Sequence, residues 1–325
     1  MTLWQAGGFH AELTRQSKYW TSAFLALWAL LGLCTPLQGA PAKPDKDEGP
    51  PEAINLPLET RDGVALRATF YPGSKGKKSV PIVILHEWKG NRTLYKDLAL
   101  MLQAKGHAVL VPDLRGHGES TSMVQRGQEQ ARLNAVRIKK KDIDLMVSQD
   151  MEAVKRYLME QNNQEELNIE KLCIIGVEMG AVVAANWAMQ DWAWPVLPAF
   201  KQGQDVKALV LVSPEWSFKG ATMAPAIDNA KLQGNLSVMV MVGSQDKKSM
   251  QSAEKTHNVL KRFHTEPSEK DAAIKKTLYM IELETSLQGA KLIEQADLKA
   301  KPYILAFIDR RLVEQSFPWS LRQRP

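Results

Sequence analysis

The sequence predicts a protein of the α/β class, with a mostly parallel central sheet and helices on both of its faces. From residue 80 onward, short apolar runs alternate with stretches of helical periodicity, which is the pattern of parallel strands connected by helices. One of these runs leads into the segment Gly-x-Glu-x-Gly at residues 176–180, which is followed by small and apolar residues. Such a segment indicates a strand that turns sharply into a helix.

An antiparallel hairpin precedes this sheet. Apolar and polar residues alternate on both sides of Arg61, Asp62 and Gly63, which indicates two strands joined by a tight turn. The segment between residues 214 and 236 is short, so we expect little or no cap domain. We expect strands at residues 80–87, 107–113, 171–177, 206–214, 236–244 and 277–284. We expect helices at residues 92–105, 123–160, 180–191, 247–264 and 289–313.

The first forty residues have the pattern of a signal peptide. Arg15 and Lys18 precede an apolar run that is too short for a comfortable membrane span, and small residues follow around Ala40 and Ala42. We therefore expect residues 1–40 to be cleaved on export, and an uncleaved membrane anchor is the alternative. The setting that we expect is a bacterial periplasm, envelope or exterior.

The exported part divides into three segments. Residues 41–54 are proline-rich and charged, which predicts a disordered linker. Residues 55–315 form the expected α/β domain, and residues 316–325 form a C-terminal tail. Cys173 is the single cysteine after residue 40, so we expect no internal disulfide.

Composition and charge restrict the partners. The chain has 325 residues and a net charge of +6, and a cluster of basic residues at 137–141 has the pattern of a solvated helix face. No nucleic-acid-binding module is visible, so we expect no nucleic-acid partner and no cofactor. The partner that remains is an unknown small molecule or a protein, and the membrane is reached only through an uncleaved N-terminal segment.

The element order and several motifs resemble the α/β-hydrolase superfamily, and the resemblance covers nearly all of residues 55–315. Residues 109–120 resemble the segment after the fourth strand of that family, in which Asp113 shapes a tight loop and His117 is not catalytic. Residues 83–91 are closest to dienelactone-hydrolase relatives. The resemblance implies an α/β-hydrolase fold with a site built from a nucleophile, an acid and a histidine.

Glu178 stands at the nucleophile position of this resemblance, where the family normally has serine. Gly176 and Gly180 flank it, because a strand that turns sharply into a helix leaves no room for side chains at these positions. A carboxylate needs no base to become an anion, and it can attack a carbon centre directly. Release of the resulting ester requires an activated water.

The other two triad positions are Asp246 and Gln288. Asp246 follows the strand at 236–244, where the superfamily keeps its acid, and Gln288 aligns with the histidine. An amide can position a water but cannot accept a proton near neutral pH. The resemblance therefore implies a triad that lacks both its hydroxyl nucleophile and its base.

Glu87, Trp88 and Met179 are expected beside the elbow. The resemblance makes Glu87 a site residue and Trp88 an apolar wall, whereas a surface carboxylate and a packing aromatic are the alternative. Met179 is expected as an apolar neighbour. Since a carboxylate is favoured at a helix N-terminus, we expect Glu178 to turn toward the amides of Met179 and Glu87.

Three functions can be weighed against these residues. The first is an exported hydrolase-fold protein that has lost serine-hydrolase activity and binds a ligand or partner. The second is an active hydrolase of the ester or peptide-bond class, in which Glu178 and Glu87 act as a carboxylate pair. The third, a cation site between the two glutamates, has too few oxygen ligands in view, so we expect no metal.

Overall fold

A computed structural model describes the chain at residues 49–125, 128–195, 197, 201–268, 270 and 275–322. These residues belong to one compact unit, Asp47–Pro325. The expected signal peptide and most of the expected linker lie outside the described residues. Within the described residues, no helix has the length and apolar character needed to cross a membrane.

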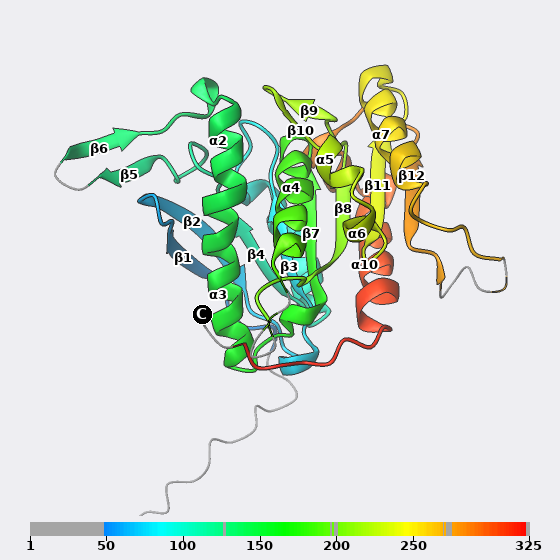
Figure 1. Cartoon of the computed structure of the whole chain (residues 1–325), viewed down its shortest axis with the longest axis horizontal. Helices are drawn as coiled ribbons and strands as arrows, with labels where there is room; N and C mark the ends of the chain where they lie inside the picture. The colour runs from blue at the N-terminus through cyan, green and yellow to red at the C-terminus, as the bar shows by residue number, and fades with distance from the viewer. Residues whose placement is uncertain are drawn as a thin grey trace, which may run out of the picture. The chain divides into compact units, whose positions relative to one another are not determined.

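A ten-stranded sheet forms the centre of the described unit (Figure 1). The strand order is β12-β11-β8-β7-β3-β4-β2-β5-β6, and β1 pairs with β2 outside this path. Neighbouring strands from β12 to β4 are parallel, whereas β1, β2, β5 and β6 pair antiparallel with their neighbours. The strands are β1 (Ile54–Glu59), β2 (Val64–Tyr71), β3 (Pro81–Leu85), β4 (Ala108–Pro112), β5 (Ser122–Gln125), β6 (Gln128–Arg132), β7 (Leu172–Val177), β8 (Val206–Val212), β11 (Ser237–Gly243) and β12 (Leu278–Leu283). The predicted hairpin and the six predicted strands are confirmed.

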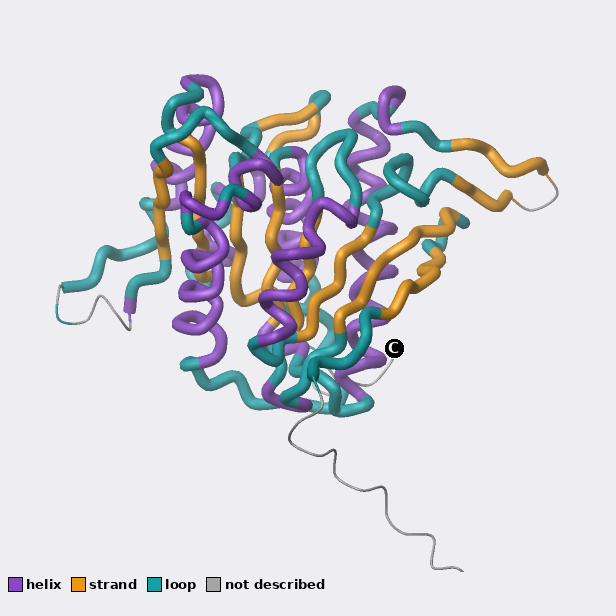
Figure 2. Tube along the Cα trace, turned by 180° about the vertical axis from the view of Figure 1, so that it is seen from behind, coloured by secondary structure: helices purple, strands orange, loops and turns teal. Residues whose placement is uncertain are grey.

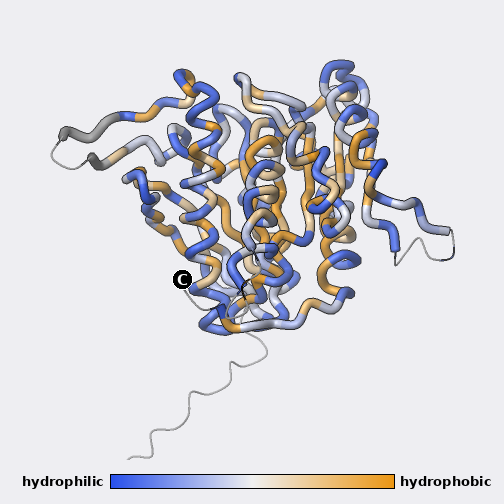
Figure 3. Tube along the Cα trace, viewed as in Figure 1, coloured by the Kyte–Doolittle hydropathy of each residue, from blue (hydrophilic) through white to orange (hydrophobic). Residues whose placement is uncertain are grey.

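Helices cover both faces of the sheet, because successive residues of the central strands point to opposite faces. In β3, Ile82 and Ile84 pack with one hydrophobic cluster, whereas Val83 and Leu85 pack with the other. Helices α1 (Lys96–Ala104), α9 (Gly289–Glu294) and α10 (Ala300–Ile308) contribute to the first cluster. The second cluster takes residues from α3 (Met151–Asn163), α4 (Met179–Ala193) and α7 (Lys247–Leu260). Figure 2 shows helices on the reverse face, and Figure 3 shows apolar residues concentrated along the central strands.

The single helix expected at residues 123–160 is wrong. The structure forms a hairpin of β5 and β6 there, which projects from the sheet in Figure 1. Two shorter helical pieces, α2 (Lys140–Leu145) and a π-helical turn (Met146–Asp150), then lead into α3. The hairpin exists because Ser122 and Met123 pair with the free edge of β2, and this tertiary pairing outweighs local helical preference.

The helix expected at residues 289–313 is also divided. Lys299 adopts a left-handed conformation with φ of 56°, which separates α9 and a short 3-10 helix from α10. A π-helical turn, Asp309–Val313, ends the segment. Between β8 and β11 the chain forms only a small hairpin of β9 (Ser217–Phe218) and β10 (Ala221–Thr222) and two one-turn helices, α5 (Ala224–Ile227) and α6 (Ala230–Gln233).

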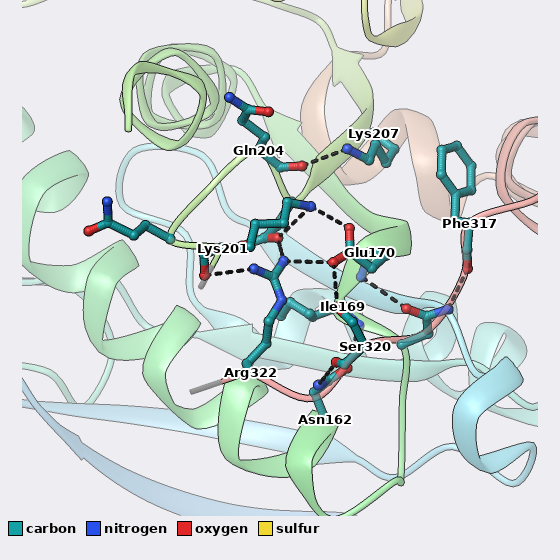
Figure 4. A network of polar contacts seen from close by, with 12 residues as sticks. Asn162, Ile169, Glu170, Lys201, Gln204, Lys207, Phe317, Ser320 and Arg322 are labelled. Carbon is teal, nitrogen blue, oxygen red and sulfur yellow. Dashed lines mark hydrogen bonds and ion pairs between the residues drawn. The ribbon is translucent and has the colours of Figure 1, made fainter. Parts of the chain in front are cut away.

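The described part of the predicted tail is attached to the domain. Asn168 donates a hydrogen bond to the carbonyl oxygen of Phe317 at 2.8 Å, and Asn162 donates one to that of Ser320 at 3.0 Å. Arg322 ends this stretch in a group of ion pairs with Glu170 and Asp205 (Figure 4). Residues 317–322 therefore belong to the folded domain rather than to a free tail.

Candidate functional site

The turn between β7 and α4 is an elbow that only glycine permits on either side of Glu178. A Cβ atom at Gly180 would lie 2.3 Å from the carbonyl oxygen of Leu85, and one at Gly176 would lie 2.6 Å from the Cα atom of Ala181. Glu178 itself has φ of 47° and ψ of −111°, a conformation that non-glycine residues rarely adopt. Such strain is characteristic of functional positions.

A pocket of about 360 Å³ opens beside Glu178. Strand ends far apart in the sequence meet there, because Glu87 follows β3, Glu178 follows β7 and Gln288 follows β12. The pocket is lined by Glu87, Glu178, Ser286, Leu287, Gln288, Ala290 and Lys291, and this lining contains no histidine. The structure thus brings together three of the residues that the sequence singled out.

The carboxylate of Glu178 points into this pocket. A Cβ atom at Gly289 would lie 2.6 Å from Oε1 of Glu178, so the carboxylate lies directly against the backbone of that glycine. Among the described residues, the side chain makes no capping hydrogen bond to the first amides of α4. The structure therefore differs from the expectation that Glu178 folds back onto the amides of Met179 and Glu87, because the elbow projects its side chain toward α9.

The environment of Glu178 disfavours its negative charge. Burial, followed by the charges of Glu87 and Glu215, raises the pKa of Glu178 from 4.5 to about 7. Glu215, which the sequence did not single out, follows β8 and is half-buried. Glu178 thus exchanges a proton near neutral pH, which is the property expected of a group that acts as acid or base or accepts a hydrogen bond from a ligand.

Glu87 is held by a tyrosine. The hydroxyl of Tyr95, a fully buried residue just before α1, donates a short hydrogen bond to Oε2 of Glu87. Burial, followed by the charge of Glu87, raises the pKa of Tyr95, so the hydroxyl keeps its proton and acts as the donor. Glu87 is half-buried, which agrees with a site residue rather than a surface carboxylate. No pattern in the sequence connects Tyr95 with Glu87.

The amide of Gln288 is engaged at both ends. Its Oε1 atom accepts a hydrogen bond of 2.7 Å from the hydroxyl of Ser213, and its Nε2 atom donates one of 2.8 Å to the carbonyl oxygen of Gly243. The hydroxyl of Ser213 accepts a bond of 3.1 Å from the amide of Gly289. The side chain at the expected histidine position is therefore fixed by its surroundings, and it offers no proton acceptor of imidazole strength.

Asp246 stands at the start of α7. Its Oδ1 atom accepts a hydrogen bond of 2.8 Å from the amide of Ser249, which makes Asp246 the N-cap of the helix. The hydrogen bonds to Ser249 hold the pKa of Asp246 below its ordinary value. Asp246 does not line the pocket, so its part in the site remains a prediction from the resemblance.

Trp88 and Met179 do not line the pocket either. The indole of Trp88 donates a hydrogen bond of 2.8 Å to the carbonyl oxygen of Ala135, and the ammonium groups of Lys89 and Lys219 lie 4.3 Å and 4.5 Å from its ring centroid. The side chain of Met179 is fully buried in the core below the elbow. Both residues support the elements around the site.

The histidines nearest to the site in the sequence are structural. His86 is fully buried, its Nδ1 atom lies 2.7 Å from the carbonyl oxygen of Glu87, and its Nε2 atom accepts a hydrogen bond of 3.0 Å from the amide of Leu114. Burial, followed by the proximity of His117, lowers the pKa of His86 to about 4. With both ring nitrogens engaged, His86 is not placed to act as the base for Glu178.

The fold and the strained elbow define a protein of the α/β-hydrolase superfamily. The family model for serine aminopeptidase, S33, matches residues 76–289, which is more than half of the chain. The chain belongs to this family. An uncharacterized protein of Mycobacterium tuberculosis is 24% identical over 140 residues, which make up 43% of this chain and 42% of that protein, so the match spans less than half of this relative.

Solved structures of hydrolases share the fold. A Pyrococcus furiosus esterase is 15% identical with a TM-score of 0.54, over 80% of this chain and 93% of that chain. A carboxyl esterase from Bacillus coagulans is 11% identical with a TM-score of 0.57, over 80% and 99% of the two chains. A Klebsiella pneumoniae protein assigned as a dienelactone hydrolase is 13% identical with a TM-score of 0.53, over 80% and 98%. These likenesses concern the fold alone.

Proposed function

We propose that this protein is an exported member of the α/β-hydrolase superfamily that has lost serine-hydrolase activity and binds a ligand or a partner protein at the pocket beside Glu178. The observation that supports the proposal is the chemistry at two positions that the resemblance assigns to the nucleophile and the histidine. The elbow presents a carboxylate instead of a hydroxyl, and the pocket offers the engaged amide of Gln288 instead of an imidazole. Nucleophile and base act as one unit, so loss of both removes the reaction that they perform.

The pocket favours a neutral or cationic ligand. Glu87 and Glu178 line it, and the charge of Glu215 also acts on Glu178. A cationic group placed among these side chains would favour the ionised form of Glu178, so binding would release the proton that Glu178 holds near neutral pH. Lys291 at the same pocket would disfavour a cation on its own side.

A second function is favoured by the raised pKa of Glu178. A carboxyl group with a pKa of about 7 in the same pocket as the tyrosine-bound Glu87 is an arrangement in which two carboxyl groups can take different roles in proton transfer. In this alternative the protein is a hydrolase of the ester or peptide-bond class that uses altered chemistry.

Turnover assays separate the two functions. Protein without residues 1–40 would be tested on short acyl esters and amino-acid amides, beside Glu178→Ala and the exposed control Glu254→Ala. We expect no turnover above background from any of the three proteins. Turnover that Glu178→Ala abolishes and Glu254→Ala preserves would instead establish the second function.

A double variant tests the assignment of the two replaced positions. Glu178→Ser combined with Gln288→His restores the hydroxyl and the imidazole on an elbow that is still assembled. We expect the double variant to hydrolyse an activated ester such as p-nitrophenyl acetate, and Glu178→Ser alone to remain inactive because it has no base. Activity in neither variant would contradict the placement of Gln288 at the histidine position.

A further inference from the structure

A second cleft, larger than the pocket beside Glu178, lies next to the loop after β4. Its volume is about 560 Å³, which is within the range of small-molecule sites. The cleft is lined by Lys89, Gly90, Gly116, His117, Gly118, Thr121, Arg132, Leu133, Asn134, Ala135 and Arg137. This set shares only Lys89 and Gly90 with the loop that carries Glu87, and none of its residues lines the pocket of the proposed function.

The charge of the cleft is of one sign. Lys89, Arg132 and Arg137 supply three basic side chains, and the lining contains no acidic residue. Among the described residues, none of the three cations forms an ion pair. The carboxylates of Glu87 and Asp113 lie behind Gly90 and Gly118 of this lining, and Asp113 is paired with Arg92. Cations gathered around a concave surface raise the local concentration of anions.

The walls of the cleft are joined by hydrogen bonds. The amide of Ala135 donates to the carbonyl oxygen of Gly116 at 2.9 Å, and the amide of Leu133 donates to that of Thr121 at 2.8 Å. On the other side, the indole of Trp88 donates to the carbonyl oxygen of Ala135 at 2.8 Å. The backbone of the cleft is therefore held in place without a ligand, which lowers the entropy cost of binding.

The backbone of the loop after β4 requires glycine at position 116. A Cβ atom at Gly116 would lie 3.2 Å from the amide nitrogen of Ala135, and Gly116 has φ of 79°. Between Gly116 and Gly118, the ring of His117 contributes to the wall, and its Nδ1 atom lies 3.1 Å from the carbonyl oxygen of Arg115. The Nε2 atom is buried and has no hydrogen-bond partner among the described residues.

We propose that this cleft binds a small oxyanion that carries two or more negative charges, of the phosphate or polycarboxylate kind. The planar guanidinium groups of Arg132 and Arg137 match the paired oxygens of both anions, and Lys89 supplies a further charge from the opposite loop. This site shares no lining residue with the pocket beside Glu178, where Glu87 and Glu178 disfavour an anion.

Isothermal titration of the full chain tests the proposal, with pyrophosphate and citrate as probes of the two kinds of oxyanion. We expect at least one probe to bind with one site per chain, and to bind more weakly as salt is added. Arg132→Gln and Arg137→Gln should each raise the Kd about tenfold, because each removes a charge-assisted pair, and the double variant should bind too weakly to measure. Arg310→Gln removes an exposed arginine outside the cleft and should leave the Kd unchanged.

Two results would overturn the proposal. One is the absence of binding by both probes to the full chain. The other is binding that the double variant retains, or that Arg310→Gln weakens to the same degree, since either would indicate general attraction to a basic surface. Arg132 and Arg137 are exposed, and thermal unfolding of each variant checks that the fold is kept. Failure of this site would leave the turnover experiments on Glu178 unaffected.

Discussion

The carboxylates at the two ends of the parallel sheet differ in whether they form ion pairs with basic side chains. Near the N-terminal ends of β7 and β8, acidic and basic side chains alternate in a network that Figure 4 shows in part. The network consists of Glu170, Asp191 and Asp205 together with Lys155, Lys201 and Arg322. At the C-terminal ends of the strands, Glu87, Glu178 and Glu215 gather instead, and none of them forms an ion pair among the described residues.

This difference changes the acidity of the two groups of carboxylates. Burial alone would raise the pKa of Glu170, but the hydrogen bonds and charges of Lys201 and Arg322 outweigh it and hold that pKa below its ordinary value. Burial and neighbouring carboxylates instead raise the pKa of Glu178 to about 7. The ion-pair network at the N-terminal ends of β7 and β8 therefore stabilises the fold. The carboxylates at the C-terminal ends of the strands instead have the properties of a functional site, where a ligand or a proton supplies the missing interaction.

Removal of Lys155 should have the largest effect on stability. Its Nζ atom lies 2.6 Å from Asp191 and 3.1 Å from Asp205, and all three residues are buried. Lys155→Met would leave two carboxylates without this partner, at an expected loss of about 3 to 5 kcal/mol in the free energy of unfolding. Urea denaturation at pH 7 measures it. A loss below about 1 kcal/mol would contradict the stabilising role of this ion-pair network.

Arg322 connects the C-terminal segment to the same network. It pairs with Asp205 and lies 3.1 Å from Glu170. Arg322→Met should lower the free energy of unfolding by about 2 kcal/mol, less than Lys155→Met, because Lys201 still contacts both acids. It should also increase proteolysis of residues 314–322, measured by mass spectrometry after brief exposure to protease. Unchanged cleavage would show that the segment is held by other contacts.

Glu178→Gln tests the raised pKa of Glu178 at the C-terminal ends of the strands. The pKa of Glu178 is about 7 in the folded protein against an ordinary 4.5, so the folded state binds more protons than the unfolded chain between these pH values. The contribution of Glu178 to stability is therefore complete below about pH 4.5 and is lost as the pH rises through 7. Glu178→Gln should stabilise the protein by about 1 to 2 kcal/mol at pH 8, after allowance for solvent screening.

The same variant should have little effect at pH 5, where Glu178 is protonated in the folded protein. Urea denaturation at pH 5 and pH 8 measures both values, and Glu254→Gln at an exposed position of α7 is the control. A stability difference that does not change with pH would contradict the raised pKa of Glu178.

The smallest effect on the free energy of unfolding is expected for an exposed ion pair. Lys140 and Asp144 form an ion pair of 2.8 Å one helical turn apart, and both are exposed. Lys140→Met should change the free energy of unfolding by less than about 0.5 kcal/mol. Urea denaturation of Lys140→Met and Lys155→Met compares the same substitution in an exposed and a buried ion pair. Similar losses in the free energy of unfolding would show that burial does not strengthen the pair.

Much of the fold could be predicted because its signals are local. Apolar runs such as residues 206–214 identify buried strands, and the glycines around Glu178 identify the elbow, because each depends on residues close in the sequence. The β5–β6 hairpin could not be predicted, since its strand pairing with Ser122 and Met123 comes from the edge of β2. A local pattern cannot show an edge that only the folded sheet provides.

The candidate site also contains residues that could be predicted from the sequence and residues that could not. The resemblance to the hydrolases anticipates that Glu178 and Gln288 meet, and the structure brings both to one pocket. It does not anticipate Ser213, which bonds to Gln288 from a distant part of the sequence, or Tyr95, which bonds to Glu87 from the next segment of the chain. Such partners are set by side-chain direction in three dimensions, for which one sequence carries no signal.

The central claim is that Glu178, at the elbow between β7 and α4, is a carboxyl group that forms no ion pair within the described part of the chain. A carbon-13 NMR titration of the glutamate side-chain carboxyls, with the Glu178 signal assigned through Glu178→Gln, measures its pKa directly. A midpoint near pH 7 is the predicted result. A midpoint at or below 4.5 would mean that a cation or a set of amides stabilises the carboxylate, and would contradict the account.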